Sequence, residues 1–576
     1  MQHTLWAPKA DTVDLLLGTS TWQPGDDLER IPLSGDGEYW EVPQIEHGVA
    51  YGFSIDGGPL RPDPRSAEQP WGVHEASRAF DTSTISWSDD RFDGVDARGA
   101  VVYEMHVGTF TNEGTFTSAI TKLDHLKSIG VDMVELMPVA SFPGKRGWGY
   151  DGVSWTAVHE AYGGPQGLAE FVDACHNARI GVCLDVVYNH LGPDGNYLAE
   201  FGPYFTGKHE TPWGTALNFD DDGNEGVREH LLSSALRWFT EFHIDALRLD
   251  AIHAMIDDSP VHILGELAEA TRSLSGELGR PLRLIAESDL NDVTVLTPTD
   301  RGGLGMDMQW ADDVHHAVHS YFTGESHGYY ADFDAEDALS KVFSGVFYHD
   351  GITSTFRGKE WGAPVTDEFD GHAFVVYDQD HDQVGNRAVG DRPSEHLSET
   401  ETLASAALIL LSPFTPMLFQ GQEWNTKTRF AFFTDHNDEL GPLVSEGRIS
   451  EFSSHGWDEI YGESFEVPDP QALSTFEGSK LDWDKVEDNS DYLTFVKKII
   501  EIRKGVAEFA SPDRSATRLE KVGDRQLVLH RGTSRLVINI SDDELTVEGA
   551  EILAQWGDVA QGGNLTLSPN SIVVLR

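Results

Sequence analysis

The sequence predicts an α/β protein whose largest part is a (β/α)8 TIM barrel, with an N-terminal β-sandwich and a C-terminal antiparallel β-domain. Two observations support this prediction. From Val101 onwards, eight short apolar segments alternate with stretches of helical periodicity, and eight such units favour a closed parallel barrel. Before and after that region, short apolar runs are separated by Gly, Pro and Asp, which is typical of small antiparallel sheets.

The first region, residues 1–92, is expected to form the β-sandwich, similar to a carbohydrate-binding module. Its strand candidates are "TVDLLLG", "EYWEVP" and "GVAYGFSI" at residues 12–18, 38–43 and 48–55. The proline-rich stretch at residues 57–72 predicts a long loop, because proline lacks the N–H that a strand ladder needs.

The second region, residues 93–508, is expected to form the barrel with inserted loops. A helix is expected at residues 226–242, where Val227, Leu231, Ala235 and Phe239 recur every four residues. The region ends in a helical pattern at residues 491–504, which Asn489 or Ser490 is placed to cap. The eight strand candidates are residues 101–110, 130–138, 180–190, 244–253, 283–289, 305–310, 373–382 and 415–424.

The third region, residues 509–576, reads as an antiparallel β-domain. Strand candidates follow one another closely, at residues 525–531, 535–541, 563–568 and 571–576.

The composition excludes several classes of partner. The chain has 96 Asp and Glu against 41 Lys and Arg, a formal net charge of −55, so nucleic acids and anionic membranes should be repelled. No stretch of 18 apolar residues occurs and the N-terminus lacks a secretory pattern, so we expect a cytoplasmic protein. Cys175 and Cys183 are expected to be reduced, buried thiols.

The stretch "IDALRLDAIHAM", residues 244–255, places charges inside an apolar strand. Alternate side chains of a strand share a face, so Arg248 and Asp250 should point into the barrel while the flanking Leu247 and Leu249 pack against the outer helices. Barrel enzymes carry their sites where the strands end at the carboxyl side. Taken alone, the pair fits a buried structural ion pair equally well.

Three other strand candidates also end in polar side chains. Any one of these could cap a helix, but four coinciding clusters favour a site that uses carboxylates, such as one for glycoside hydrolysis. The side chains are Asp185, Asn189 and His190 on one candidate, Glu287 on the next, and Asp380, His381 and Asp382 on the last.

Aromatic residues surround these segments in Gly- and Pro-rich loops. Trp148, Tyr150 and Trp213 fit either platforms for sugar rings or loops packed on the barrel. His315 and His319 stand four residues apart on a predicted helix and could hold zinc, but an HExxH motif is absent. Phosphate-binding glycine motifs are also absent, so we expect no metal and no cofactor.

The stretches "DVVYNH", "DALRLDAIH", "LIAESD" and "DQDHDQ" resemble, in order, the four conserved stretches of the α-amylase superfamily, glycoside hydrolase family 13. The resemblance implies a retaining mechanism with Asp250 as nucleophile and Glu287 as general acid and base. Asp382 would stabilise the transition state and Arg248 would orient Asp250. One departure is Asp380, where the family usually has Asn.

The resemblance also implies roles for the surrounding residues. His190, His381 and Tyr150 would bind the sugar at the cleaved position, and His253 would face the leaving group. Trp213 is a further substrate-binding candidate, and Asp185 and Asn189 would support the site.

Longer stretches, among them "ELMPVASFPGKRGWGYDGV" and "HDQVGNRAVGDR", are similar to the maltooligosyltrehalose trehalohydrolase family. That resemblance implies hydrolysis of the α-1,4 bond next to a terminal trehalose, on a maltooligosaccharide-type substrate supplied by a maltooligosyltrehalose synthase. A glycogen branching enzyme is the closest alternative within the superfamily. An inactive glycan-binding scaffold is the alternative from another class.

Overall fold

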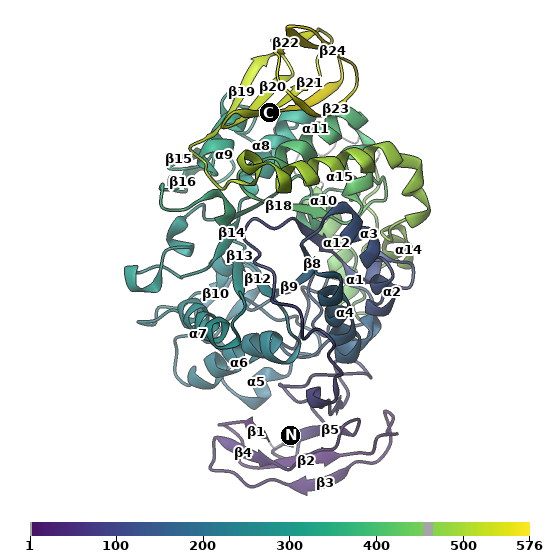
Figure 1. Cartoon of the computed structure of the whole chain (residues 1–576). Helices are drawn as coiled ribbons and strands as arrows, with labels where there is room; N and C mark the ends of the chain where they lie inside the picture. The colour runs from purple at the N-terminus through teal and green to yellow at the C-terminus, as the bar shows by residue number, and fades with distance from the viewer. Residues whose placement is uncertain (1–2, 453–464) are drawn as a thin grey trace.

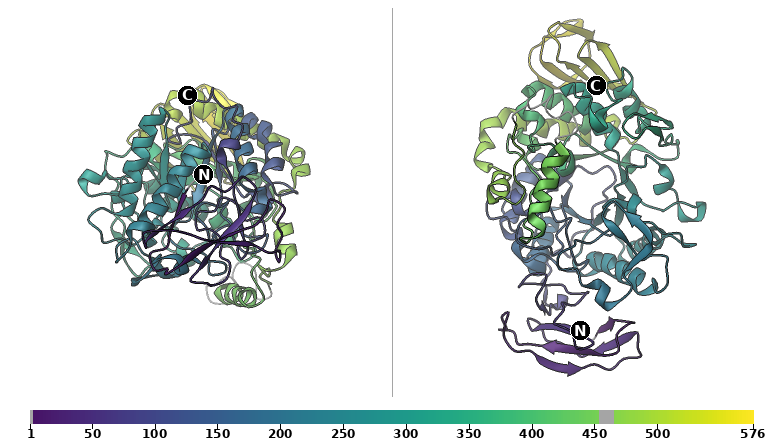
Figure 2. Two further views of the ribbon diagram at one scale, coloured as in Figure 1. Left: turned by 90° about the horizontal axis from the view of Figure 1, so that it is seen from below. Right: turned by 180° about the vertical axis from the view of Figure 1, so that it is seen from behind.

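The computed structural model describes residues 3–452 and 465–576. A closed barrel forms the centre of the molecule, and smaller β-sheets lie at the two opposite ends of the molecule (Figure 1). The views in Figure 2 show the same arrangement, with the N-terminal sheets and the C-terminal sheets at opposite ends.

All eight predicted barrel strands are confirmed, and every pairing between them is parallel. Around the barrel they follow in chain order, as expected of a (β/α)8 fold. The strands are β7 (Val102–Met105), β8 (Met133–Leu136), β9 (Gly181–Val186), β12 (Ala246–Leu249), β13 (Arg283–Ala286), β14 (Met308–Trp310), β17 (Phe374–Tyr377) and β18 (Thr415–Phe419).

Helices cover the outside of the barrel. The predicted helix at 226–242 is confirmed as α6 (Glu225–Glu241), and its four periodic apolar residues are buried. The helix that ends the region is α15 (Ser490–Gly505); Asn489 takes its N-cap position, but its side chain donates to the Trp424 carbonyl instead of capping the helix. Further helices include α3 (Leu123–Ile129), α4 (Gly164–Ala178), α7 (Ile263–Leu278), α8 (Asp312–Thr323), α9 (Ala338–Gly345), α11 (Glu399–Leu410) and α12 (Leu440–Phe452).

The N-terminal region forms two antiparallel sheets, and their Leu5, Leu15, Val42 and Phe53 are buried in a core that is continuous with the barrel region. The three predicted strands are confirmed as β2 (Val13–Leu17), β4 (Tyr39–Val42) and β5 (Ala50–Ile55). Short strands β1 (His3–Trp6), β3 (Glu29–Pro32) and β6 (Ser77–Arg78) complete the sheets, and the proline-rich stretch is a loop as predicted.

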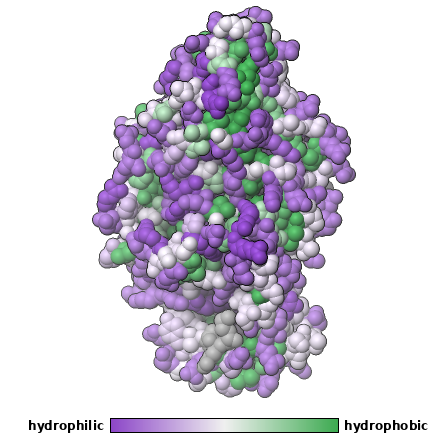
Figure 3. Space-filling model, in the orientation of Figure 1, coloured by the Kyte–Doolittle hydropathy of each residue, from purple (hydrophilic) through white to green (hydrophobic). Residues whose placement is uncertain are grey.

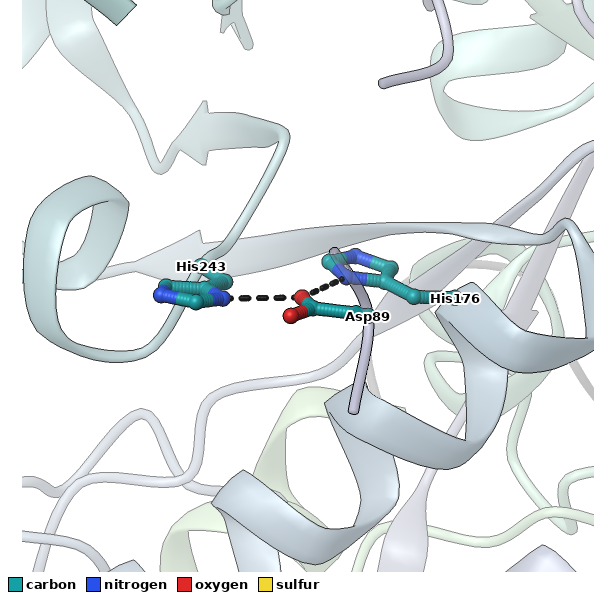
Figure 4. Close-up of side chains that lie close together, drawn as sticks. All are labelled: Asp89, His176 and His243. Atoms are coloured by element: carbon teal, nitrogen blue, oxygen red, sulfur yellow. Dashed lines mark hydrogen bonds and ion pairs between the residues drawn. The ribbon is translucent and has the colours of Figure 1, made fainter. Parts of the chain in front are cut away.

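A connecting segment, residues 79–101, links the N-terminal sheets to the first barrel strand and contains the predicted boundary at 92/93. Asp89 fastens this segment to the barrel, because its Oδ2 accepts hydrogen bonds from His176 Nδ1 and His243 Nδ1, both at 2.8 Å (Figure 4). Trp87 stacks on His243 and Phe92 stacks on His176. The contact lies at the amino ends of β9 and β12.

The C-terminal region is antiparallel, as predicted, with the four expected strands as β20 (Gln526–Arg531), β21 (Ser534–Asn539), β25 (Asn564–Leu567) and β26 (Ser571–Leu575). Trp556 Nε1 donates to Thr400 Oγ1 at 3.1 Å, which joins this domain to α11. The unpredicted strands are β19 (Thr517–Gly523), β22 (Leu545–Glu548), β23 (Ile552–Trp556) and β24 (Val559–Gln561).

Three structural observations bear on the expectations drawn from composition. Cys175 and Cys183 are both buried free thiols, as predicted. Hydrophilic residues cover much of the face shown in Figure 3. Within the described ranges, the longest apolar helical stretches fall short of what a bilayer crossing requires.

Candidate active site

The predicted alternation in the strand around Arg248 is confirmed. Leu247 and Leu249 belong to the core shared with the outer helices, whereas Ala246 belongs to the separate core inside the barrel. Arg248 therefore points inward, and Asp250, directly after β12, lies at the carboxyl mouth. The neighbouring strands β9 and β13 bring Asp185 and Glu287 to the same end.

Arg248 is the cation at the centre of this mouth. Its Nη1 donates to Asp250 Oδ1 and to Asp185 Oδ2, both at 2.9 Å, and its Nη2 lies 3.5 Å from Glu287 Oε2. The guanidinium stands over the ring of Trp310, 4.4 Å from its centroid. Since Arg248 is only 2% exposed, three carboxyl groups share one desolvated positive charge.

Both oxygens of Asp250 are held in place. Oδ1 faces Arg248, and Oδ2 accepts a hydrogen bond from Asn189 Nδ2 at 2.9 Å. Asn189 Oδ1 is in turn 2.6 Å from His190 Nδ1, and His190 Nε2 is 2.9 Å from the Tyr150 carbonyl oxygen. The predicted support by Asn189 therefore has a direct geometric basis.

Glu287 is kept protonated by its surroundings. Burial, with the nearby charges of Asp250 and Asp312, raises the pKa of Glu287 to about 8, although Arg248 opposes the shift. The Ala251 backbone N–H donates to Glu287 Oε2. Ala251 has a φ of 40°, in the left-handed region, so the chain turns sharply just after Asp250.

Asp382 lies in α10 (His381–Gly385), which follows β17. Its side chain is exposed, with Oδ1 accepting from Asn386 Nδ2 at 2.6 Å, so it can meet a ligand from the mouth. Asp380 caps α10 by accepting from the Gln383 backbone N–H at 2.6 Å. Burial raises the pKa of Asp380 well above its ordinary value, which favours the neutral form at a position where the family usually has the neutral Asn.

Tyr150 and His381 form one unit behind Asp185. The Tyr150 hydroxyl donates to Asp185 Oδ2 at 2.6 Å and lies 2.7 Å from His381 Nε2, and the two rings are stacked. His381 Nδ1 is hydrogen-bonded to Glu104, which sequence reasoning missed. The available signal was a charged residue inside an apolar strand candidate, the same signal that singled out Arg248.

The remaining predicted residues fall into two groups. Trp213, at the turn of the hairpin β10 (Phe205–Thr211) and β11 (Gly214–Leu217), is 49% exposed and stacks parallel to His190 at 4.9 Å. His253 is exposed in the turn after β12. Trp148 instead packs in the interior, stacked on Phe430 with its Nε1 donating to the Ala431 carbonyl, so the loop-packing alternative applies to it.

A cavity of about 270 Å³ opens on the Asp382 side of the mouth. Asn386, which holds Asp382, is one of its walls. Aromatic rings of Tyr329, Tyr330 and Phe356 form much of the remainder, so the cavity combines flat apolar surfaces with polar groups.

Within residues 3–452 and 465–576, two groups of His and Asp side chains lie close enough together to hold a metal ion. His315 and His319 belong to neither group. The first is the Asp89 contact, whose carboxylate already accepts from both imidazoles, at the end of the barrel away from the mouth. In the second, His209, Asp220 and Asp258, Lys208 Nζ already donates to Asp220 at 2.7 Å. His315 instead contacts the Asp378 carbonyl, and His319 contacts Glu325.

Sequence comparisons agree with this architecture. The family model for the alpha amylase catalytic domain matches residues 86–210. A malto-oligosyltrehalose trehalohydrolase from Arthrobacter ramosus is 46% identical over 97% of this chain and 96% of its own length. One from Saccharolobus solfataricus is 42% identical over 87% of this chain and 84% of its own. A branching enzyme from Corynebacterium jeikeium is 32% identical over only 53% of this chain and 47% of its own length.

Solved structures show the same fold. A putative alpha amylase from Salmonella typhimurium, 36% identical, superposes with a TM-score of 0.88 and covers 100% of this chain and 97% of its own. A pullulanase from Paenibacillus barengoltzii, 18% identical, superposes with a TM-score of 0.69 and covers 100% of this chain and 93% of its own.

The closed barrel and the alpha amylase match define a glycoside hydrolase of the α-amylase type. The near full-length similarity to several relatives narrows this class further. The chain belongs to the malto-oligosyltrehalose trehalohydrolase family.

Proposed function

We propose that the protein hydrolyses the α-1,4 bond next to the terminal trehalose of maltooligosyltrehalose, and that it does so with retention of configuration. The choice of substrate is supported by relatives of that name over almost the whole chain. The chemistry is supported by one observation: Arg248 contacts Asp250 at 2.9 Å and lies 3.5 Å from Glu287, so a carboxyl group paired with a cation and a carboxyl group of raised pKa share one pocket.

The reaction would proceed in two displacements. Asp250 attacks the anomeric carbon while Glu287 gives its proton to the glycosidic oxygen, so trehalose leaves and a maltooligosyl ester forms on Asp250. Glu287, now ionised, takes a proton from water, and the resulting hydroxide displaces Asp250. The sum is the addition of one water across the bond. Retention requires the two carboxyl groups to lie about 5–5.5 Å apart.

The other residues would bind the sugar chain. The exposed Asp382 carboxylate is free to accept hydrogen bonds from sugar hydroxyls as positive charge develops on the ring. Tyr150, His190 and His381 would contact the ring at the cleaved bond, and the exposed face of Trp213 would carry a neighbouring one. Exposed His253 would face the leaving group, and the aromatic cavity beside Asn386 is of a kind that accepts a disaccharide.

The direct experiment is incubation with purified maltooligosyltrehalose and measurement of free trehalose. Trehalose release by the wild type, and its loss in Asp250→Asn, is the expected result. Formation of 1,6-branches on amylose without trehalose release would establish the branching alternative. If the wild type shows no turnover and Asp250→Asn binds the sugar with the same affinity as the wild type, the protein is a glycan-binding scaffold.

A partner and a compartment follow from this proposal. The substrate carries a terminal trehalose, so a maltooligosyltrehalose synthase must supply it. The buried free thiols of Cys175 and Cys183 fit a reducing compartment, and we place the reaction in the cytoplasm.

A further inference from the structure

Glu104 is a buried acidic residue that the proposed mechanism does not use. It stands in the middle of β7 and is 1% exposed. Its Oε2 accepts the backbone N–H of His381 at 2.8 Å, and its Oε1 accepts from His381 Nδ1. Both oxygens of Glu104 are therefore directed at one residue of the site.

The hydrogen bonds around His381 determine where its protons lie. The Tyr150 hydroxyl has one proton and gives it to Asp185 Oδ2 at 2.6 Å. Tyr150 can therefore only accept at its other contact, so His381 Nε2, 2.7 Å away, must donate. Because Nδ1 faces a carboxylate, it must donate as well. Only the doubly protonated imidazolium donates from both ring nitrogens.

We propose that Glu104 is a positioning residue for the reaction: it fixes His381 as a two-sided hydrogen-bond donor and thereby orients the Tyr150 hydroxyl towards Asp185. The inference rests on the proposed function, since it explains how Tyr150 and His381 are held where the sugar would bind. Asp185 in turn holds Arg248 at 2.9 Å, so the chain of contacts reaches the group that orients Asp250.

The charges around His381 favour this state. Burial opposes its charge and is the largest single cause, but Glu104, Asp382 and Asp380 together raise the pKa of His381 to about 10. Other titratable groups facing it come from β9, from α10 and from the chain after β7; they are Asp185, Asp380, Asp382 and His106. Among the groups that raise the pKa of His381, Glu104 acts most strongly, through its charge and through its hydrogen bond.

Glu104→Gln keeps the shape and removes the charge. Burial then dominates, so His381 becomes neutral near pH 7 and donates from one nitrogen only. His381 then lacks an N–H either for the side chain at position 104 or for the Tyr150 hydroxyl. The Tyr150 hydroxyl is therefore no longer held in the orientation that donates to Asp185. We expect kcat at pH 7 to fall by about 10- to 100-fold, with a smaller change in KM.

Glu135→Gln is the matched control. Glu135 pairs directly with Glu104 on the neighbouring strand β8 and is 1% exposed. Burial, together with Glu104, raises the pKa of Glu135 to about 8, so the same substitution changes little charge at pH 7. Its activity should stay within about twofold of the wild type at pH 5 and at pH 7.

Imidazole ¹⁵N NMR at pH 8 tests the proposal without any substrate. The His381 signals, assigned by comparison with His381→Asn, should show two protonated nitrogens in the wild type and one in Glu104→Gln. A neutral His381 in the wild type would overturn the inference, and so would a kcat of Glu104→Gln at pH 7 equal to that of Glu135→Gln. If the wild type releases no trehalose, the proposed function fails, while the NMR result still decides the role of Glu104.

Discussion

Asp312 provides a quantitative test of how the site keeps Glu287 protonated. Asp312 begins α8, just after β14, and its side chain contacts the Tyr377 hydroxyl. Burial raises the pKa of Asp312 to about 6, so it is ionised at pH 8, where Glu287 titrates. Asp312→Asn would therefore remove a negative charge that favours the protonated form of Glu287.

The strand register gives the expected size of this effect. Ala286 on β13 is opposite Gln309 on β14, so Glu287 and Asp312 are separated by one strand spacing and two residues of rise, or about 8 Å. Two unit charges at about 8 Å interact by about 2 kcal/mol at an effective dielectric constant of 20, and by about 0.5 kcal/mol at 80. One pKa unit corresponds to about 1.36 kcal/mol, so the pKa of Glu287 should fall by about 0.4–1.5 units in Asp312→Asn.

The assay is the pH dependence of kcat/KM for trehalose release between pH 5 and 10. A general acid loses activity as pH rises through its pKa, so the wild type should show a basic limb near pH 8. Asp312→Asn should move that limb to lower pH while activity at pH 6 stays within about threefold. A limb that stays in place, or moves upward, would show that Asp312 does not act on Glu287 through its charge.

Three further predictions concern separate parts of the molecule. Asp250→Asn should lower kcat on the order of 10⁴-fold or more with little change in KM, and retention of 1% activity in a turnover assay would exclude its role as nucleophile. Trp213→Ala should raise KM by about 2- to 13-fold at constant kcat and melting temperature, because its half-exposed ring contributes about 0.5–1.5 kcal/mol of stacking; a drop in melting temperature would instead indicate a structural role. Asp89→Asn should destabilise the protein by about 1–3 kcal/mol, measured by thermal unfolding, since two histidines lose their charged acceptor. Asp89 and Asp245 raise the pKa of His176 against burial, so this contribution should be complete below about pH 6.5 and decline as pH rises; an equal loss at pH 5.5 and pH 9 would contradict it.

Much of the barrel was predictable because its information is local. Each strand is a short apolar run between turn residues, and its polar end is visible in the chain itself, as with Arg248 and Asp250 or Glu287 after Ala286. The strands that escaped prediction, such as β3 and β24, are short and mostly exposed, so their side chains carry little apolar pattern. Trp148 was ambiguous for a related reason: a ring in a Gly-rich loop has the same sequence whether it meets a ligand or Phe430.

The sequence by itself determined the order of elements, the family and the residues available for chemistry, because periodicity and short motifs depend on neighbours along the chain. Only the tertiary structure decided which groups share protons and charge. Glu104 and His381 are far apart in the chain, and Arg248 lies on β12 whereas Glu287 directly follows β13. Closure of the barrel brings them within hydrogen-bonding or ion-pair distance and excludes water. Burial then raises the pKa of Glu287 against the effect of Arg248, whereas the nearby carboxylates raise the pKa of His381 against the effect of burial.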